Sequence, residues 1–469
     1  MESRRVVDHE TAGFDSIPLR SVAKQLCERR GDEQTGGLRN NRRNRDDGIR
    51  GLSRDRRHVR RVVAGVHRLR ERRCRLSVGI QRARRRVPVT FSTLSPSWAE
   101  LADMQPRPIS ARLGDGYVYG VSDDAKLWRS SDAARSWQQV GSTAWFTEKG
   151  TLLLPAGDGE VLIAASQSIW KTSGWGTGTI AKSQKLISPT SAAFLSWGVD
   201  VTPAGKAIAV HYSTNYANSY AAWFSADFGN NWSIVRNLID TGENDQHFHF
   251  ACFDPYNNNR IYLNHHSNTP PYPKDIEYSD NDGGSWTKVP RIDVIQGNNT
   301  IRRVQPTTCV PTREGLLMGS DDPFAGIYRM RRSTLEVEEF ALGAQGGVPW
   351  QLNCFATYGE LDPATGFVFT CFKQQTASGK GFIMASNAVE GGLIWEEPTS
   401  FPYTGQTGLS SAPGFYALAY QGDEIVATAI RPSAADPGKN VWWTFRAQKP
   451  VFELDPSGLL FAIARVSRS

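Results

Sequence analysis

Ser225-Ala-Asp-Phe-Gly-Asn-Asn-Trp232 is the stretch that decides the fold, because its pattern occurs three times in the chain. Ser130–Trp137 (SSDAARSW) and Ser279–Trp286 (SDNDGGSW) share with it a Ser at the first place, Asp or Asn at the third, a small residue at the fifth and Trp at the eighth. The third-place side chain can accept backbone N–H groups of its own turn, and glycine at the fifth place tolerates a positive φ angle. Because recurring turns indicate architecture before function, we expect each octet to fasten two strands. The fastening residues are Ser130, Asp132, Trp137, Ser225, Asp227, Gly229, Trp232, Ser279, Asn281, Gly283 and Trp286.

Short apolar runs bounded by Gly, Asn and Asp surround the octets and are typical of strands. A pair of such runs occurs seven times after residue 105. The first member of each pair covers residues 116–122, 159–166, 205–212, 259–265, 315–321, 365–371 or 423–429. The second member contains Trp128, Trp170, Trp223, Glu277, Tyr328, Ile383 or Trp442, at spacings of 42 to 59 residues. Another strand precedes the pair, most clearly at residues 247–254 and 351–359.

A period near 50 residues with several strands per unit predicts a β-propeller. The 365 residues from 105 to 469 give seven four-stranded antiparallel blades, or six if the first or last unit merges with its neighbour. The predicted fold class is therefore all-β. We expect a propeller over residues 105–469, preceded by a segment of low order over residues 1–95.

Residues 1–95 differ sharply in composition from the rest of the chain. They contain 24 Arg, one Lys and no Trp or Tyr, and they carry a net charge of +14 against −7 for the remainder. Three interpretations stay open. The segment is a disordered tail that cannot bury enough apolar surface to fold, or it lies outside the mature protein, with Met104 as an alternative start. As a third interpretation it binds nucleic acid through phosphates, although its Arg-dense part lacks aromatic residues for stacking on bases.

The three octets resemble the Asp-box, or BNR repeat, of sialidases and related β-propellers. The resemblance covers about residues 105–469, with degenerate copies of the octet at Thr172–Trp175 and Ser386–Trp395. It implies the propeller fold more strongly than it implies an activity, because Asp-box propellers include glycosidases, sorting receptors, assembly factors and binding modules.

Functional residues are expected at the channel mouth opposite the octets. In an antiparallel blade the octet follows the third strand, so the start of the first strand and the end of the second lie at the other face. Four of the eight His fall in such places within 20 residues, and His247 and His249 alternate by two on one side of a strand. A ring of His, Arg and aromatic groups suits a polar, anionic or sugar ligand. The predicted ligand-binding residues are His211, Tyr212, His247, His265, Gln305, Trp350, Gln351, Lys373 and Arg431.

Catalysis would need groups at the same mouth, and the candidates are His249, Arg303, Asp321 and Asp322. A glycosidase uses two carboxylates about 5–10 Å apart. The resemblance to sialidases implies three arginines, of which Arg303 and Arg431 could be two, together with a Tyr–Glu pair that is not evident at this mouth. Arg107-Pro108-Ile109 also departs from the family's Arg-Ile-Pro motif. The alternative is that these residues have only a structural role. In that case His247 and His249 line a water-filled channel, and Asp321 and Asp322 cap a turn.

Two functions therefore stay open. The first is recognition of a glycan or another polar ligand, as in a phage tail or host-recognition component. The second is a divergent glycoside hydrolase (exo-sialidase-like) or a lyase that acts on a surface polysaccharide. In the second function the His cluster would supply acid and base groups.

The expected partners are a carbohydrate or surface glycan and a protein in a larger assembly, with nucleic acid only through the Arg-rich segment. No run of 18 apolar residues occurs, so no membrane span is expected. No apolar stretch follows Met1 and the six Cys lack metal-ligand spacing, which favours a cytoplasmic or virion-associated protein. We expect no cofactor. We also expect no metal, because the carboxylates that would complete a His site are not in the same blade.

Overall fold

A computed structural model gives the structure of the protein. The chain divides into two units, residues 1–88 and 89–469, and all described residues belong to the second. The structure describes residues 97–462 except for 103–104, 111, 142–149, 176–179, 190–191, 214–219, 244–245, 268–273, 291–292, 297–299, 321–326, 340–353, 365, 375–381, 387–392, 397–413, 434, 437–439, 450–451 and 455–459.

The strands of this unit form seven four-stranded antiparallel blades. Blade 1 consists of β2 (Arg107–Ser110), β3 (Val118–Val121), β4 (Leu127–Ser130) and β5 (Gln138–Gln139). Blade 2 consists of β6 (Gly150–Pro155), β7 (Val161–Ala165), β8 (Ser168–Ser173) and β9 (Ala181–Ile187). Blade 3 consists of β10 (Ala193–Val201), β11 (Ala207–Tyr212), β12 (Ala221–Ser225) and β13 (Ser233–Asn237). Blade 4 consists of β14 (Gln246–Asp254), β15 (Arg260–Ser267), β16 (Lys274–Ser279) and β17 (Thr287–Lys288). Blade 5 consists of β20 (Pro306–Pro311), β21 (Leu316–Ser320), β22 (Ile327–Met330) and β23 (Val337–Glu339).

Blade 6 consists of β24 (Cys354–Leu361), β25 (Val368–Gln374), β26 (Phe382–Ser386) and β27 (Leu393–Glu396). Blade 7 combines β28 (Gly414–Gln421), β29 (Glu424–Pro432) and β30 (Asn440–Gln448) with β1 (Ser97–Glu100). One residue pair, Lys373 with Gly414, joins the sheets of blades 6 and 7. Two hairpins lie outside the blades, β18 (Asp293–Gln296) with β19 (Thr300–Arg303) and β31 (Phe452–Leu454) with β32 (Leu460–Ala462).

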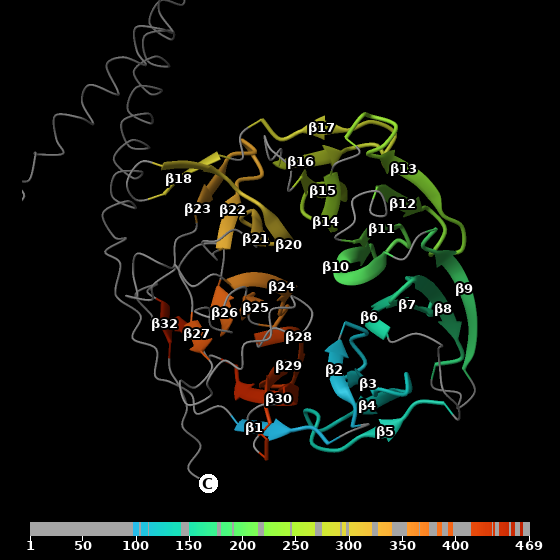
Figure 1. Cartoon of the computed structure of the whole chain (residues 1–469), viewed down its shortest axis with the longest axis vertical. Helices are drawn as coiled ribbons and strands as arrows, with labels where there is room; N and C mark the ends of the chain where they lie inside the picture. Colours follow the sequence, from blue (N-terminus) through green and yellow to red (C-terminus); the bar gives the residue numbers. More distant parts are fainter. Residues whose placement is uncertain are drawn as a thin grey trace, which may run out of the picture. The chain divides into compact units, whose positions relative to one another are not determined.

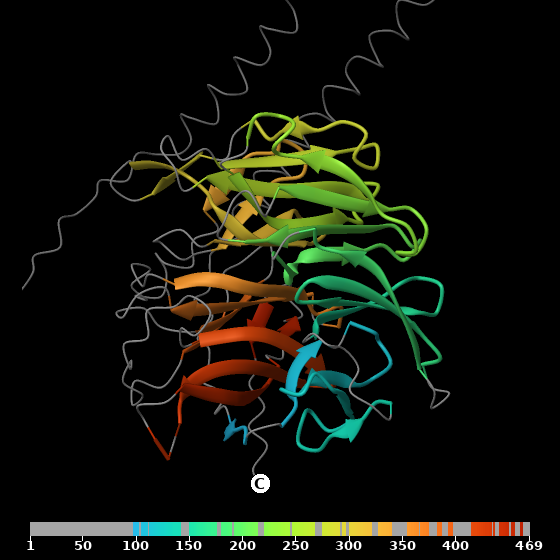
Figure 2. The ribbon, with the colours of Figure 1, turned by 45° about the vertical axis from the view of Figure 1, so that its right-hand side comes forward.

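The blades form a ring. The first strands β2, β6, β10, β14, β20, β24 and β28 contact one another in that order, and β28 contacts β2 again (Figure 1). Figure 2 shows neighbouring blades as adjacent twisted layers. Each blade is covered by a neighbour on both faces, which explains why β3, β7 and β21 are buried along their whole length. The prediction of an all-β propeller, with seven rather than six blades, is confirmed for the described residues.

The three octets form the same hydrogen-bonded turn after β4, β12 and β16. The first-place Ser hydroxyl donates to the third-place side chain at 2.7, 2.8 and 2.9 Å. It accepts the N–H of the fifth place at 2.9, 3.0 and 2.9 Å. The third-place side chain accepts the N–H of the seventh place at 2.9 Å in every case. The expected bonding within the turn is therefore present in all three octets.

The octets fasten blades to each other as well as strands within a blade. A Cβ on Gly229 would lie 2.7 Å from Leu162 of blade 2, and one on Gly283 would lie 2.5 Å from Val235 of blade 3. The Trp286 indole donates to the Val235 carbonyl at 2.8 Å. In the first octet, the N–H of Ala133 donates to the Gln421 side chain of blade 7 at 2.6 Å. Each octet therefore docks on the blade that precedes its own in the ring.

Blade 7 is completed by the start of the described chain. β1 pairs antiparallel with β30, in the register Ser97 with Arg446 to Glu100 with Trp443. This strand lies between the predicted segment 1–95 and the predicted propeller 105–469, and it was not predicted from the sequence. The described residues contain no helix, and hence none that is long and apolar enough to cross a lipid bilayer.

Candidate functional site

Three histidines meet at the ends of β14 and β15 that lie away from the octet, where the channel mouth was expected from the sequence. His247 and His249 project from the start of β14, and His266 projects from the end of β15 directly opposite His247. The Nε2 atoms of His247 and His249 lie 3.0 Å apart. The centroid of the His266 ring lies 4.3 Å from that of His247 and 4.0 Å from that of His249. We call these three residues the three-histidine cluster.

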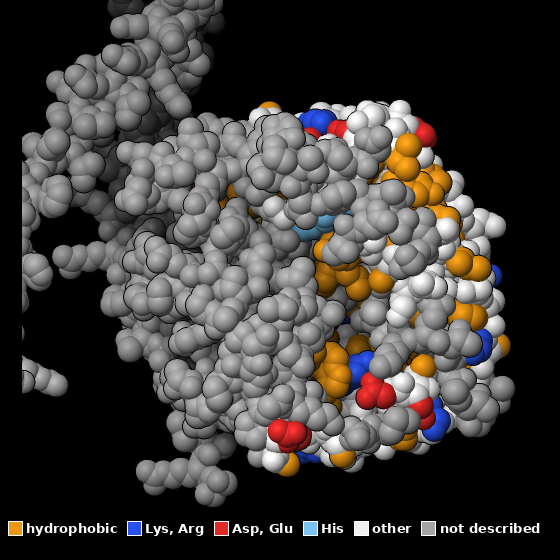
Figure 3. Space-filling view, viewed as in Figure 1, with side chains coloured by type: hydrophobic (Ala, Val, Ile, Leu, Met, Phe, Trp, Pro, Cys, Tyr) orange, Lys and Arg blue, Asp and Glu red, His pale blue; other side chains and the backbone are white. Residues whose placement is uncertain are grey.

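Neighbouring blades hold the cluster in place. From blade 3, the Tyr212 ring stands edge-on to His247 and His249, with centroids 5.3 and 5.7 Å away. From the segment before β20, the Gln305 amide hydrogen-bonds to His266 Nε2 at 2.9 Å. A β-bulge between Phe248 and Phe250 shifts the register of β14 beside His249. All three rings are almost fully buried, while Figure 3 shows a small area of histidine surface among the surrounding side chains.

Burial sets the charge of His247 in this cluster. Desolvation, with a smaller contribution from His265, lowers the pKa of His247 to about 4. At neutral pH this imidazole is therefore uncharged, and one of its ring nitrogens can accept a hydrogen bond or bind a cation.

Three further predicted residues are described, but the structure does not bring them into the cluster. His211 packs against Trp223 with ring centroids 4.5 Å apart, its Nδ1 lies 2.8 Å from the Ser188 hydroxyl, and desolvation lowers its pKa to about 3. His265 faces the opposite side of β15. Lys373 is buried with its Nζ 4.8 Å from the centroid of the Tyr416 ring, and desolvation lowers its pKa to about 7.

The remaining predicted residues cannot be placed in the cluster. Asp321, Asp322, Trp350 and Gln351 lie outside the described residues. Arg303 lies in β19 and Arg431 in β29, but the structure describes only the backbone at these two positions. A carboxylate pair for glycoside hydrolysis thus stays a prediction.

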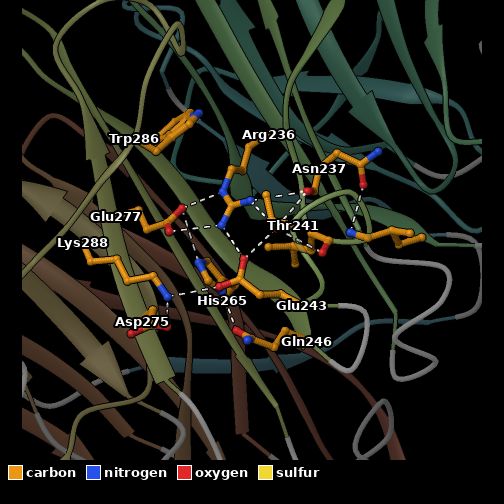
Figure 4. A network of polar contacts seen from close by, with 12 residues as sticks. Arg236, Asn237, Thr241, Glu243, Gln246, His265, Asp275, Glu277, Trp286 and Lys288 are labelled. Carbon is orange, nitrogen blue, oxygen red and sulfur yellow. Dashed lines mark hydrogen bonds and ion pairs between the residues drawn. The ribbon is translucent and has the colours of Figure 1, made fainter.

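His265 belongs instead to a charged network between blades 3 and 4, shown in Figure 4. Arg236 is its centre, with Nε 2.8 Å from Glu277 and a terminal nitrogen 2.5 Å from Glu243. His265 Nε2 lies 3.5 Å from Glu277. Lys288 bridges Glu243 and Asp275 at 3.1 and 2.9 Å. Burial raises the pKa of Glu277, but hydrogen bonds from His265 and Arg236 outweigh burial and lower it to about 2.

A pocket of about 470 Å³ opens beside this network. Its lining residues are Ile234, Val235, Arg236, Asn237, Asp240, Thr241, Glu277 and Trp286. Arg236 and Glu277 pair with each other there, so the two opposite charges largely neutralise one another. The arrangement is typical of a structural contact between blades.

A second polar cluster, which was not predicted from the sequence, lies at the octet end of the channel. Arg112 of blade 1 approaches Glu360 of blade 6 at 3.3 Å and Asp200 of blade 3 at 3.7 Å. The Tyr358 hydroxyl donates to Glu360 at 2.5 Å, and the Tyr420 hydroxyl of blade 7 donates to it at 3.3 Å. A Tyr–Glu pair is thus present, but at the mouth opposite the predicted one. The spacing Tyr-x-Glu in residues 358–360 was a signal that could have indicated it.

No protein-family model and no curated protein matches the chain. Among solved structures, the chain is similar to the GH74 xyloglucanase from Xanthomonas campestris at 14% identity and a TM-score of 0.47, over 74% of this chain and 55% of the xyloglucanase, so it spans about half of that protein. It is similar to streptogramin B lyase at 12% identity and a TM-score of 0.48, over 75% and 97% of the two chains. It is also similar to YCF48 bound to D1 peptide at 12% identity and a TM-score of 0.45, over 77% and 98%. At these identities the likeness concerns the fold alone.

Proposed function

We propose that this propeller binds a carbohydrate, or a polar ligand of similar chemistry, at the channel mouth around the three-histidine cluster. The observation that carries the proposal is the convergence of Tyr212, Gln305 and the three imidazoles from blades 3 to 5. An aromatic ring offers an apolar face to a sugar ring, and amide and imidazole groups fix the orientation of hydroxyl groups by hydrogen bonds.

The alternative is a divergent glycoside hydrolase or lyase at the same mouth. The uncharged imidazole of His247 at neutral pH favours it, because such a group can act as a general base. A hydrolase of this kind would also need carboxylates, and Asp321 and Asp322 follow β21, whose end lies at this mouth.

The finer identity of the propeller is part of the proposal. The shared hydrogen-bond pattern of the three octets supports an Asp-box, sialidase-like propeller. In that setting we propose a host-recognition or phage-tail component in the cytoplasm or on the virion, with a protein neighbour in a larger assembly.

A glycan array probed with the full chain tests the binding proposal. We expect binding that Tyr212→Ala abolishes, since it removes the aromatic wall of the mouth. Tyr256→Ala is the matched control, because Tyr256 is exposed in the turn after β14, at the opposite end of that strand. Failure of every glycan to bind, or equal loss in the two variants, would refute a carbohydrate site at this mouth.

A hydrolysis assay on the bound glycans separates the two functions. Binding without turnover supports recognition. Turnover that Asp321→Ala abolishes would establish the enzyme and replace the binding proposal.

A further inference from the structure

The cluster geometry goes beyond glycan recognition, because it matches the coordination sphere of a metal ion. His247, His249 and His266 each offer one ring nitrogen, and these three atoms lie within 4.8 Å of one another. Ligands of a tetrahedral Zn²⁺ at 2.0–2.1 Å are about 3.3 Å apart. The 3.0 Å between Nε2 of His247 and Nε2 of His249 is close to that separation.

The ligand chemistry selects the class of metal. Three imidazoles suit Zn²⁺, Co²⁺, Ni²⁺ and Cu²⁺, whereas Ca²⁺ and Mg²⁺ prefer oxygen ligands.

The surroundings of the cluster resemble the support that metal-binding histidines require. Such histidines are usually oriented by a hydrogen bond to the second ring nitrogen. Gln305 hydrogen-bonds to Nε2 of His266, so it would orient this ring if Nδ1 is the nitrogen that binds the metal. Antiparallel pairing of β14 with β15 fixes His247 opposite His266, so two of the three ligands are held by the sheet itself.

A second group of metal-ligand type, Glu243, His265 and Asp275, is a weaker candidate. Lys288 lies 3.1 Å from Glu243 and 2.9 Å from Asp275, and Arg236 lies 2.5 Å from Glu243. Two protein cations thus already occupy the oxygens that a metal would need.

We propose that His247, His249 and His266 bind one divalent transition-metal ion of the Zn²⁺ class at the channel mouth. Three protein ligands leave a fourth coordination position for water or for an oxygen of a bound ligand. No metal was expected from the sequence because carboxylates to complete the site are not in the same blade, but three imidazoles make a carboxylate unnecessary.

Metal binding is tested on the full chain without a polyhistidine tag, and no glycan is needed. The protein is stripped with chelator and titrated with Co²⁺ by visible absorption, and Zn²⁺ is then added as competitor. We expect one equivalent of Co²⁺ with the intense absorption of a four-coordinate site, displaced by Zn²⁺. In His249→Gln we expect the affinity to fall by more than about 100-fold, since even second-shell changes cost about 10–100-fold.

His211→Gln is the matched control, because it replaces another buried mouth histidine outside the cluster. Wild-type affinity in this control and an unchanged circular dichroism spectrum in both variants support the assignment. If His249→Gln fails to fold, Gln305→Ala replaces it, with an expected loss of about 10–100-fold. Absence of stoichiometric binding to wild type, or equal loss in His211→Gln, would overturn the proposal. Neither of these results would decide whether the protein binds a carbohydrate, which the glycan array tests separately.

Discussion

At the scale of single residues, the fifth place of the second and third octets leaves no room for a Cβ atom, whereas Ala134 occupies this place in the first octet. Gly229 has a φ angle of +74°, and a Cβ there would lie 2.7 Å from Leu162 Cδ2. Gly229→Ala therefore adds backbone strain of about 1–2 kcal/mol and overpacking of about 1–3 kcal/mol. We expect the free energy of unfolding to fall by about 2–5 kcal/mol, as measured by urea denaturation.

Gly242→Ala separates the two causes of that loss. Gly242 has a similar φ angle of +79° but no atom within 4 Å of an added Cβ. Its substitution should cost only the backbone strain, about 1–2 kcal/mol. Equal losses for the two glycines would show that contact with Leu162 adds nothing, against the docking of octets on the preceding blade.

Lys373 predicts a dependence of stability on pH. Desolvation lowers its pKa to about 7, so between pH 7 and 10.5 the unfolded chain holds a proton that the folded protein has released. Stability should therefore rise with pH across this window, by up to about 1.4 kcal/mol per pH unit. Lys373→Met removes the buried charge, so we expect it to be more stable than wild type at pH 7. In urea denaturation, the difference in free energy of unfolding between the variant and wild type should shrink towards pH 10.5. A difference that stays constant with pH would contradict the low pKa of Lys373.

At the scale of elements, β1 closes the ring by supplying the fourth strand of blade 7. A chain that starts at Met104 lacks this strand and exposes the edge of β30. We expect residues 104–469 to unfold at a lower temperature than residues 89–469, as measured by differential scanning calorimetry. Equal melting temperatures would show that pairing of β1 with β30 contributes little.

Local pattern predicted most strands, and distance in sequence explains the exceptions. The second strand of each blade could be predicted because it is a short apolar run between turn residues. β1 could not be predicted, because its partner β30 lies more than 300 residues further on and no local signal marks the pairing. The alternation of His247 and His249 was readable in the same way. That His266 joins them while His265 faces away depends on the register of β14 with β15, which a single strand does not reveal.

At the scale of the whole molecule, the octet-end cluster ties distant blades together across the channel. Arg112, Asp200, Glu360 and Tyr420 come from blades 1, 3, 6 and 7. Burial raises the pKa of Glu360 and of Asp200, although the charge of Arg112 opposes the rise in both. The cluster was invisible to sequence analysis because it forms only when the ring is complete.

Arg112→Met should therefore weaken the whole ring, and more strongly at higher pH. The change leaves Glu360 buried without its cation, and breaking a buried pair in this way costs about 3 kcal/mol. A buried carboxyl with a raised pKa is protonated where the unfolded chain is already ionised, so stability falls as pH rises through the folded pKa. Without Arg112 that pKa rises further and the loss extends towards neutral pH. Urea denaturation should thus show a larger loss in the free energy of unfolding at pH 8 than at pH 5. Adding Glu360→Gln to Arg112→Met should recover most of this loss. A deficit that does not depend on pH, or no recovery in the double variant, would mean that Arg112 acts through packing and not through its charge.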